Sequence, residues 1–302
     1  MTKVLEELSD AIAGLADGVG PSVVGVGRGG SGVVVGEGRV LTNAHNLRGG
    51  EVTVTFPDRR RAEATPLGVD VEGDLAVLSV ETAGAPAVPW GAPAPRVGSA
   101  VVALAHNRAG GARASVGFVS ATGVTFRGPG GRLVEGAIEH TAPLARGASG
   151  GPVVDAAGRL LGIDTHRVGD GAYLAVAADE GLRARVDALG RGESPTRRRL
   201  GVAVAPRHVA RRLRRSVGLA ERDGVLVLGV EEGGPAARAG IGRGDLIVAV
   251  ADTAVSSVDD LASALADAPA GTPVTVAVVR GADERTVAVD LEGNGTAHEG
   301  SV

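Results

Sequence analysis

A serine set between glycines, in the run Gly-Ala-Ser-Gly-Gly-Pro at 147–152, is the chain's best candidate nucleophile. Glycine adopts backbone angles that other residues avoid, so consecutive N–H groups can converge on one point beside the Ser149 hydroxyl. That geometry suits attack on a carbonyl, with the resulting oxyanion received by backbone donors. An ordinary hairpin turn explains the same hexamer, so the interpretation depends on partners for the serine elsewhere.

A serine hydroxyl needs a base to take its proton, and histidine is the side chain whose pKa suits that role near neutral pH. His45 follows the apolar run 38–44, where a strand leads into a loop, and this position would expose the ring while holding it. His106 also follows a strand-like run, so position alone leaves it open. His140 and His166 flank the serine segment and fit a surface or rim position as well as a catalytic one. The remaining histidines are His208 and His298.

The base in turn needs an acid that orients it and stabilises the imidazolium. Asp74 precedes the apolar run 75–78 and is the best candidate, although a turn residue at the start of a strand is the plain alternative. Asp70 and Glu72 lie in the loop before it, and we expect both to face water. The order His45, Asp74, Ser149 is one of the three arrangements of a Ser-His-Asp triad.

The elements that must position these residues are short apolar runs separated by turn residues. The chain has 302 residues, of which 44% are hydrophobic and 49 are glycine, but only five are Phe, Tyr or Trp, so Val, Leu, Ile and Ala must build the core. Many strands without intervening helices argue for an all-β barrel or sandwich. The expected strands are 22–26, 32–35, 52–56, 76–80, 100–104, 114–121, 136–140, 152–154, 160–164 and 172–176.

Helical patterns flank this β region, and a second domain follows it. Apolar residues recur at helical spacing in 3–16 and again around 182–189, whereas 190–199 has no large apolar side chain and reads as a linker. Beyond the linker, strand-like runs alternate with helical segments at 206–219, 235–239 and 258–268, which predicts an α+β domain. We expect a helix at 1–20, a β domain at 21–190, a linker at 191–199, the α+β domain at 200–292 and a disordered tail at 293–302.

Composition and charge exclude several functions. A net charge of −4 gives no general case for binding nucleic acid or an anionic membrane. The arginines between 207 and 215 are expected to form a solvated helix face. The absence of cysteine excludes disulfides, thiol catalysis and thiolate metal sites. No stretch resembles a membrane span, and the acidic residues near the N-terminus do not fit a signal peptide, so we expect a cytoplasmic location for the chain as written.

Three segments together resemble the catalytic segments of trypsin-like proteases of the HtrA/Deg family. They are Thr-Asn-Ala-His at 42–45, Gly-Asp-Leu-Ala-Val-Leu at 73–78 and Gly-Ala-Ser-Gly-Gly-Pro at 147–152, and the likeness continues through 153–165. The second domain resembles the PDZ domain that follows the protease in that family. There Arg-Leu-Gly-Val at 199–202 is similar to the carboxylate-binding loop, and 233–241 with 244–247 to a short helix and the next strand.

The resemblance implies a trypsin-like double β-barrel followed by a PDZ domain, and it implies roles for the residues. Ser149 would be the nucleophile, His45 the general base and then acid, and Asp74 the residue that orients His45. The N–H groups of Gly147 and Ser149 would form the oxyanion hole. The PDZ loop, comprising Arg199, Leu200, Gly201 and Val202, would bind the C-terminus of a peptide. Neither a metal nor a cofactor is implied.

The implied function is a serine endopeptidase of protein quality control that cleaves unfolded or damaged proteins. Because no acid lies between Thr141 and Ser149, with Pro143 expected near the base of the specificity pocket, we expect cleavage after small or medium apolar residues. Assembly into a homo-oligomer is compatible with the resemblance. The alternative is a peptide-binding, chaperone-like protein whose protease domain is resting or inactive.

Overall fold

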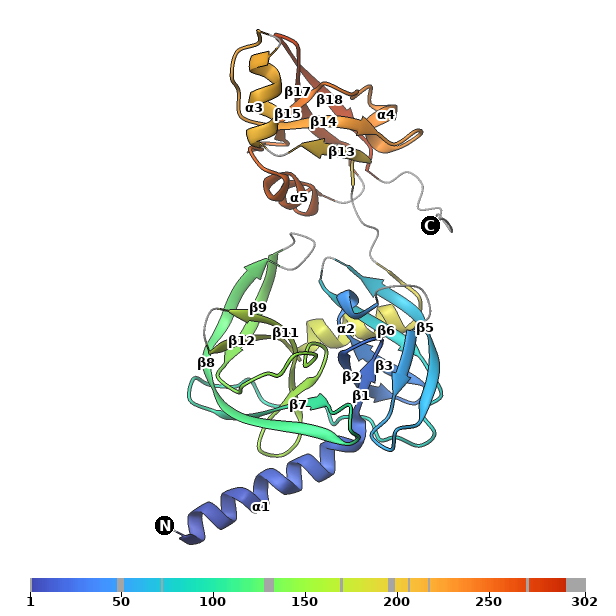
Figure 1. Cartoon of the computed structure of the whole chain (residues 1–302), viewed down its shortest axis with the longest axis vertical. Coiled ribbons are helices and arrows are strands. Elements are labelled where there is room, and N and C mark those ends of the chain that lie inside the picture. The colour runs from blue at the N-terminus through green and yellow to red at the C-terminus, as the bar shows by residue number, and fades with distance from the viewer. Residues whose placement is uncertain are drawn as a thin grey trace. The chain divides into compact units, whose positions relative to one another are not determined.

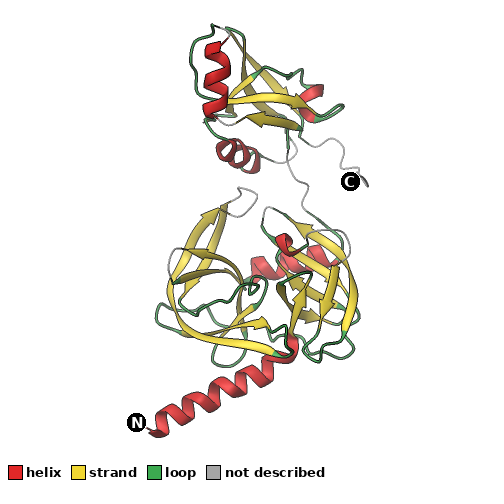
Figure 2. Ribbon diagram, viewed as in Figure 1, coloured by secondary structure: helices red, strands yellow, loops and turns green. Residues whose placement is uncertain are grey.

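The computed structural model contains two compact units (Figure 1), the first formed by described residues of 2–127 and 133–194 and the second by those of 199–291. Each unit is built mainly from antiparallel strands (Figure 2). No helix in the described residues is long and apolar enough to cross a membrane. The structure describes residues 2–47, 52–71, 73–127, 133–168, 171–194, 199–205, 207–216, 218–269 and 272–291.

Six strands of the first unit close into a barrel in the order β1-β2-β3-β6-β5-β4. β-Branched residues suit the pleated, half-buried surface of such strands, and Val24, Val34, Val40 and Val54 all point into this barrel's core beside Phe56. The strands are β1 (Val23–Val26), β2 (Gly30–Gly36), β3 (Arg39–Thr42), β4 (Val52–Thr55), β5 (Arg61–Asp70) and β6 (Leu75–Ser79).

Six further strands close into a second barrel in the order β10-β11-β12-β9-β8-β7. Gly117 lets the long strand β8 pass against the chain near Ala142, since a Cβ at that glycine would lie 2.1 Å from the Ala142 backbone nitrogen. The strands are β7 (Ala100–His106), β8 (Ala112–Arg127), β9 (Leu133–His140), β10 (Pro152–Val154), β11 (Leu160–Val168) and β12 (Ala172–Ala177).

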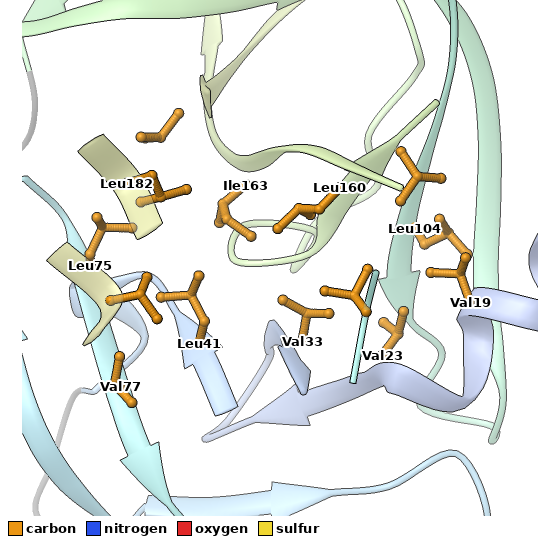
Figure 3. Packing of buried hydrophobic residues seen from close by; sticks show 14 of the residues in the cluster. Val19, Val23, Val33, Leu41, Leu75, Val77, Leu104, Leu160, Ile163 and Leu182 are labelled. Carbon is orange, nitrogen blue, oxygen red and sulfur yellow. The ribbon is translucent and has the colours of Figure 1, made fainter. Parts of the chain in front are cut away.

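A shared apolar core joins the two barrels (Figure 3). Val33 and Leu41 from the first barrel and Leu104, Leu160 and Ile163 from the second are all completely or almost completely buried in it. Burying one such side chain contributes about 1.5–3 kcal/mol. The core therefore fixes the relative position of the two barrels without large aromatic residues.

Two α-helices and two 3₁₀ turns complete the first unit. Helix α1 (Thr2–Val19) packs against the shared core of the barrels through Leu15 and Val19 near its end, and a 3₁₀ turn, η1 (Gly20–Ser22), follows it. Helix α2 (Glu180–Gly190) begins at Asp179, whose carboxylate accepts a 2.7 Å hydrogen bond from the Leu182 N–H. The second 3₁₀ turn, η2 (Ala44–Asn46), follows β3.

The second unit is a sheet in the order β13-β14-β15-β17-β18, with β16 paired to β15. The arginines of α3 are only in part the solvated face that we expected, because Arg214 is buried and donates to the Ala220 carbonyl. The elements are β13 (Val202–Ala205), α3 (Arg207–Ser216), β14 (Val225–Val230), α4 (Pro235–Arg238), β15 (Leu246–Val250), β16 (Thr253–Ala254), α5 (Val258–Ala266), β17 (Val274–Arg280) and β18 (Asp283–Val289).

The mainly β fold class predicted from the sequence is confirmed, with two closed barrels and a separate α+β unit. Strand β5 was missed, because its outward residues are polar and Pro66 interrupts its pattern. The register shifts between Pro66 and Gly68, and a bulge of this kind is where a strand accepts proline. The expected tail at 293–302 and positions 195–198 of the expected linker lie outside the described residues.

Candidate active site

His45 and Asp74 meet at one end of the first barrel. His45 lies in η2 directly after β3, Asp74 directly precedes β6, and β3 pairs with β6. The Nδ1 atom of His45 is 2.8 Å from Oδ2 and 3.0 Å from Oδ1 of Asp74, and the His45 backbone N–H also donates to Oδ1 at 3.0 Å. A carboxylate only accepts, so Nδ1 carries the proton and Nε2 is left as the basic atom.

Asp74 is held in an unusual backbone conformation. Its φ of 53° lies in the left-handed region, which aspartate tolerates better than most residues but at an energetic cost. Asn43 stabilises this turn, since its side-chain amide donates to the Asp74 carbonyl at 2.9 Å. The Thr165 hydroxyl donates to Asp74 Oδ2 at 3.0 Å. The carboxylate is 4% exposed and His45 is 28% exposed, so the acid is buried while the base can reach a substrate.

The glycines around Ser149 are required by the space around them. Gly147 has a φ of 88°, and a Cβ there would lie 2.1 Å from the Gly29 carbonyl oxygen. Gly150 has a φ of 90°, and its Cβ would lie 2.1 Å from the Ser31 carbonyl oxygen. Left-handed angles and close backbone contacts both exclude a side chain. The hexamer is therefore a tightly packed loop wedged against β2.

Two residues of the first barrel anchor this loop of the second. The Ser31 hydroxyl donates to the Gly147 carbonyl at 2.7 Å, and the Ser31 N–H donates to the Ser149 carbonyl at 3.0 Å. The Asn46 side chain also donates to the Ser149 carbonyl at 3.0 Å. The sequence analysis missed both residues, since a serine in a glycine-rich run and an asparagine in a loop have no distinctive local pattern.

The loop leaves two backbone donors available. The carbonyls of Gly147 and Ser149 accept the bonds from Ser31, and the Ala148 carbonyl accepts from the Gly151 N–H at 2.9 Å. In a trans peptide the N–H points opposite to the carbonyl, so the Ser149 N–H points away from that turn. Among the residues that the structure describes, nothing accepts from the N–H of Gly147 or of Ser149. Within these residues, the two N–H groups proposed for the oxyanion hole therefore have no competing acceptor.

Thr165 connects the serine to the acid, which sequence reasoning also missed. The Ser149 hydroxyl donates to the Thr165 carbonyl at 3.2 Å, while the Thr165 side chain holds Asp74. The register between β11 and β12 shifts between Asp164 and His166, so Thr165 occupies a bulge. A bulge re-aims a side chain, and here it aims the hydroxyl at Asp74.

The other candidate histidines do not join this site. The His106 ring packs against Gly25, its backbone N–H donates to Ser31 Oγ at 3.0 Å, and burial together with Arg108 lowers its pKa. His140 takes neither the surface or rim position nor the catalytic position that its place in the sequence left open, because its side chain is completely buried against Asp164. His208 is exposed on α3 in the second unit. The His166 side chain and all of His298 lie outside what the structure describes.

Asp70 is also not where the sequence analysis expected it. It is buried rather than facing water, and its Oδ1 accepts from the Gly73 N–H at 2.8 Å. This bond closes the turn that leads into Asp74. Glu72 lies outside the described residues, and within them no three His, Cys, Asp or Glu side chains are grouped so as to hold a metal ion.

In the second unit, the segment 199–202 forms a turn at the start of the edge strand β13. The carbonyls of Leu200 and Gly201 accept from the N–H groups of Ala236 and Glu231, each at 2.8 Å, and Gly201 has a φ of 71°. Arg199 contributes a surface ion pair, with Nη2 3.2 Å from Glu231 Oε1. Val202 and Val204 pack on the same apolar cluster as residues of α5. An extended peptide added to β13 would meet an apolar wall.

Comparison with protein families assigns both units. Residues 30–163 match the family of trypsin-like peptidase domains, and residues 199–291 match the PDZ domain family. The first match includes His45, Asp74 and Ser149. The second begins at Arg199 and includes the edge strand β13.

Curated relatives extend the match over most of the chain. A probable periplasmic serine endoprotease, DegP-like, from Brucella suis is 34% identical over 90% of this chain. Only 54% of that relative is covered, so this chain spans about half its length. The serine endoprotease DegS of Escherichia coli is 30% identical over 87% of this chain and 76% of its own length.

Solved structures agree with these matches. The serine endoprotease from Yersinia pestis superposes with a TM-score of 0.58 at 27% identity, covering 91% of this chain and 96% of that one. The structure of the HtrA-type protease AlgW with a decapeptide gives a TM-score of 0.57 at 31% identity, covering 86% of this chain and 81% of that one. The chain therefore belongs to the HtrA family of trypsin-like serine proteases that carry a C-terminal PDZ domain.

Proposed function

We propose that the protein is a serine endopeptidase that cleaves unfolded or damaged proteins. The observation that carries the proposal is the His45–Asp74 pair, joined at 2.8 Å beside a glycine loop that presents Ser149 with two free backbone donors. Family membership supports the same activity. The pair also argues against the alternative of a chaperone-like protein with an inactive protease domain.

The geometry supports a two-step acyl transfer. Nε2 of His45 takes the proton of Ser149 as its oxygen attacks the scissile carbonyl, and the same nitrogen then protonates the departing amine. Asp74 keeps the Nδ1 proton in place and stabilises the imidazolium. The oxyanion accepts from the N–H groups of Gly147 and Ser149, and losing one such donor typically lowers kcat about 10²–10³-fold. In the second step Nε2 of His45 takes a proton from water as the water attacks the acyl-enzyme, and the same nitrogen returns a proton to the departing Ser149 oxygen.

We infer a preference for small or medium apolar side chains before the scissile bond. Leu144 is half-buried in the segment leading to Ser149, and no acid lies in that segment to attract Lys or Arg. Asp164, which directly precedes Thr165 in the chain, is an acid close to the site. Its carboxylate is fully buried against His140 and therefore cannot attract a basic substrate side chain. Digestion of a peptide library would reveal this preference.

The PDZ unit is proposed to bind peptide C-termini. A peptide would add to β13 as a further strand, and backbone N–H groups of 200–202 would receive its carboxylate. The apolar wall formed by Val202 and Val204 with α5 supports an apolar terminal residue. The homo-oligomer that the family resemblance allows stays a prediction, which light scattering of the full chain tests.

The direct test is cleavage of a chemically denatured protein by the full chain. Wild type should release peptides, and Ser149→Ala, which removes only an oxygen, should release none while melting at the same temperature. A native, well-folded protein should be cleaved slowly, since its peptide bonds are not accessible. Equal turnover by Ser149→Ala and wild type would overturn the proposal.

A further inference from the structure

A second His–Asp pair lies in the second barrel, and the acyl-transfer mechanism does not use it. Nε2 of His140, the last residue of β9, is 2.8 Å from Oδ1 of Asp164 in β11, and both side chains are 0% exposed. The ring of Tyr173 stacks on His140 with centroids 5.9 Å apart. Strand β12 lies between β9 and β11 in the barrel order, so the pair bridges two strands that share no backbone bonds.

Stability alone is a poor reason for this pair. Two ionisable groups lose their hydration on burial, and well-packed apolar residues often replace such a pair without loss of stability. Among the described residues, His140 Nδ1 and Asp164 Oδ2 also have no hydrogen-bond partner. Burial raises the pKa of Asp164, although the hydrogen bond and charge of His140 oppose the shift. Burial of this pair thus costs hydration free energy, so its position in the fold calls for another explanation.

The backbone of Asp164 is hydrogen-bonded to the loop 147–152, which carries Ser149. The Asp164 N–H donates to the Gly151 carbonyl at 2.9 Å, and the Asp164 carbonyl accepts from the Gly150 N–H at 2.8 Å. These are the two residues that follow Ser149. Movement of the Asp164 backbone would therefore move the turn that carries the nucleophile.

The next residue, Thr165, touches both other parts of the site, with its carbonyl on the Ser149 hydroxyl and its own hydroxyl on Asp74. Thr165 lies in the bulge and has no register partner in β12, where Asp164 pairs with Ala175 and His166 with Leu174. A bulge disrupts the local ladder, so the segment needs another support. The His140 side chain supplies one, from the far side of β12.

We propose that His140 and Asp164 are positioning residues for catalysis: their hydrogen bond holds the bulged segment 164–165 so that Ser149 and Asp74 stay in register with each other. The inference rests on the proposed peptidase function. Reacting groups displaced by about 1 Å can lose about 10²-fold in rate. Loss of the clamp should therefore lower kcat and leave KM little changed, since the substrate contacts neither side chain.

Three variants of the full chain separate positioning from stability. Asp164→Ala removes the clamp, and we expect kcat to fall about 10- to 100-fold. Asp164→Asn keeps an oxygen that accepts from the His140 Nε2–H, and most of the activity should return. The double variant His140→Leu/Asp164→Val fills the site with apolar atoms and should fold as stably as wild type. It should nevertheless be as slow as Asp164→Ala.

A core variant remote from the loop provides the control for stability. Val54 is fully buried in β4 of the first barrel, so Val54→Ala weakens the fold without touching the serine loop. At equal loss of melting temperature it should keep the wild-type kcat. Full kcat in the stably folded double variant, or equal loss in Asp164→Asn and Asp164→Ala, would overturn the inference.

Labelling of Ser149 by a fluorophosphonate distinguishes a failure of the positioning role from a failure of the proposed peptidase function. Wild type that neither labels nor cleaves would refute the peptidase function itself. Wild type that labels, together with a double variant that labels just as fast, would refute only the positioning role. The predicted result is fast labelling of wild type and Asp164→Asn and slow labelling of the other two.

Discussion

The Ser31 hydroxyl donates a 2.7 Å hydrogen bond to the Gly147 carbonyl and accepts one from the His106 N–H at 3.0 Å. One buried hydroxyl in β2 thereby ties the first barrel to the loop that carries Ser149. The proposed catalytic residues come from both barrels, with His45 and Asp74 in the first and Ser149 in the second, so the proposed site requires a fixed arrangement of the two barrels. The shared apolar core sets that relationship coarsely, and the Ser31 bonds set it locally.

Ser31→Ala should lower kcat about 10-fold or more, because the Gly147 carbonyl loses the donor that orients its peptide group. An unsatisfied buried group also costs about 1–3 kcal/mol of stability. Thr82→Val is the matched control, since Thr82 is buried and its hydroxyl accepts from the Gly38 N–H, away from the site. Steady-state kinetics and melting curves check both. Similar kcat values for the two variants would show that Ser31 has only a structural role.

Gly147→Ala should abolish measurable cleavage. The added Cβ collides with the Gly29 carbonyl and the left-handed backbone angle is strained, so the loop must move and its N–H leave the oxyanion hole. Gly123→Ala has a similar φ of 69° but no atom within 4 Å of the new Cβ, so it carries the strain without the collision. That control should keep its activity in the same peptide assay. Wild-type turnover by Gly147→Ala would exclude this glycine from the oxyanion hole.

Thr165→Val should lower kcat about 10- to 100-fold, since a hydrogen bond to a charged group contributes about 1.5–3 kcal/mol. Valine keeps the shape of threonine and the backbone carbonyl that accepts from Ser149, while the side-chain bond to Asp74 is lost. Thr165→Ser should restore most of the rate. If serine and valine variants were equally slow, the methyl packing rather than the hydroxyl would be responsible.

The two units should respond to pH with opposite signs. Burial raises the pKa of Asp164, so the folded state retains a proton that the unfolded chain releases near its ordinary value of 3.8, and the contribution of Asp164 to stability falls as pH rises above that value. For Asp245 burial acts in the same sense, but bonds from Arg280 and the Gly242 N–H outweigh it and lower the pKa. Its contribution is present above 3.8 and is lost as pH falls.

The variants Asp164→Asn and Asp245→Asn would reveal how each carboxylate contributes to stability as pH changes. Unfolding of the first unit can be followed through Trp90, the only tryptophan, and that of the second by hydrogen exchange of β15 amides. Above pH 3.8, the stability of wild type relative to Asp164→Asn should fall with rising pH until the Asp164 carboxyl is ionised in the folded state as well. Relative to Asp245→Asn it should instead fall as the solution is acidified. If the stability differences for Asp164→Asn and Asp245→Asn changed in the same direction with pH, the environments assigned to the two carboxylates would be contradicted.

Local patterns predicted much of the fold and the first members of the site. Runs of β-branched residues between turn signals located most strands, and the serine hexamer, His45 and Asp74 each carried a recognisable pattern. Strand β5 was missed because Pro66 and polar outward residues hide its alternation. The strand accepts Pro66 because of a bulge between Pro66 and Gly68, and a short window of sequence does not reveal such a bulge.

The supporting residues could not be predicted, because their roles arise from contacts between distant segments. Ser31 meets Gly147, and His140 meets Asp164, only after the barrels close. A single polar residue in or beside an apolar strand looks alike whether it faces water or a buried partner, which is why Asp70 was wrongly expected to face water and why the buried position of His140 was not considered. Short local motifs indicate the proposed triad, whereas the residues that support it are brought together only by the topology of the barrels.

The most direct test of the account is the mass of the full chain after reaction with a fluorophosphonate, followed by mapping of the modified peptide. One adduct on Ser149 is predicted for wild type, with none on Ser149→Ala and much slower reaction for His45→Ala. These results would show that the hydroxyl is activated by the His45–Asp74 pair. An unlabelled wild type, or an adduct on another residue, would contradict the assignment of Ser149 as the nucleophile.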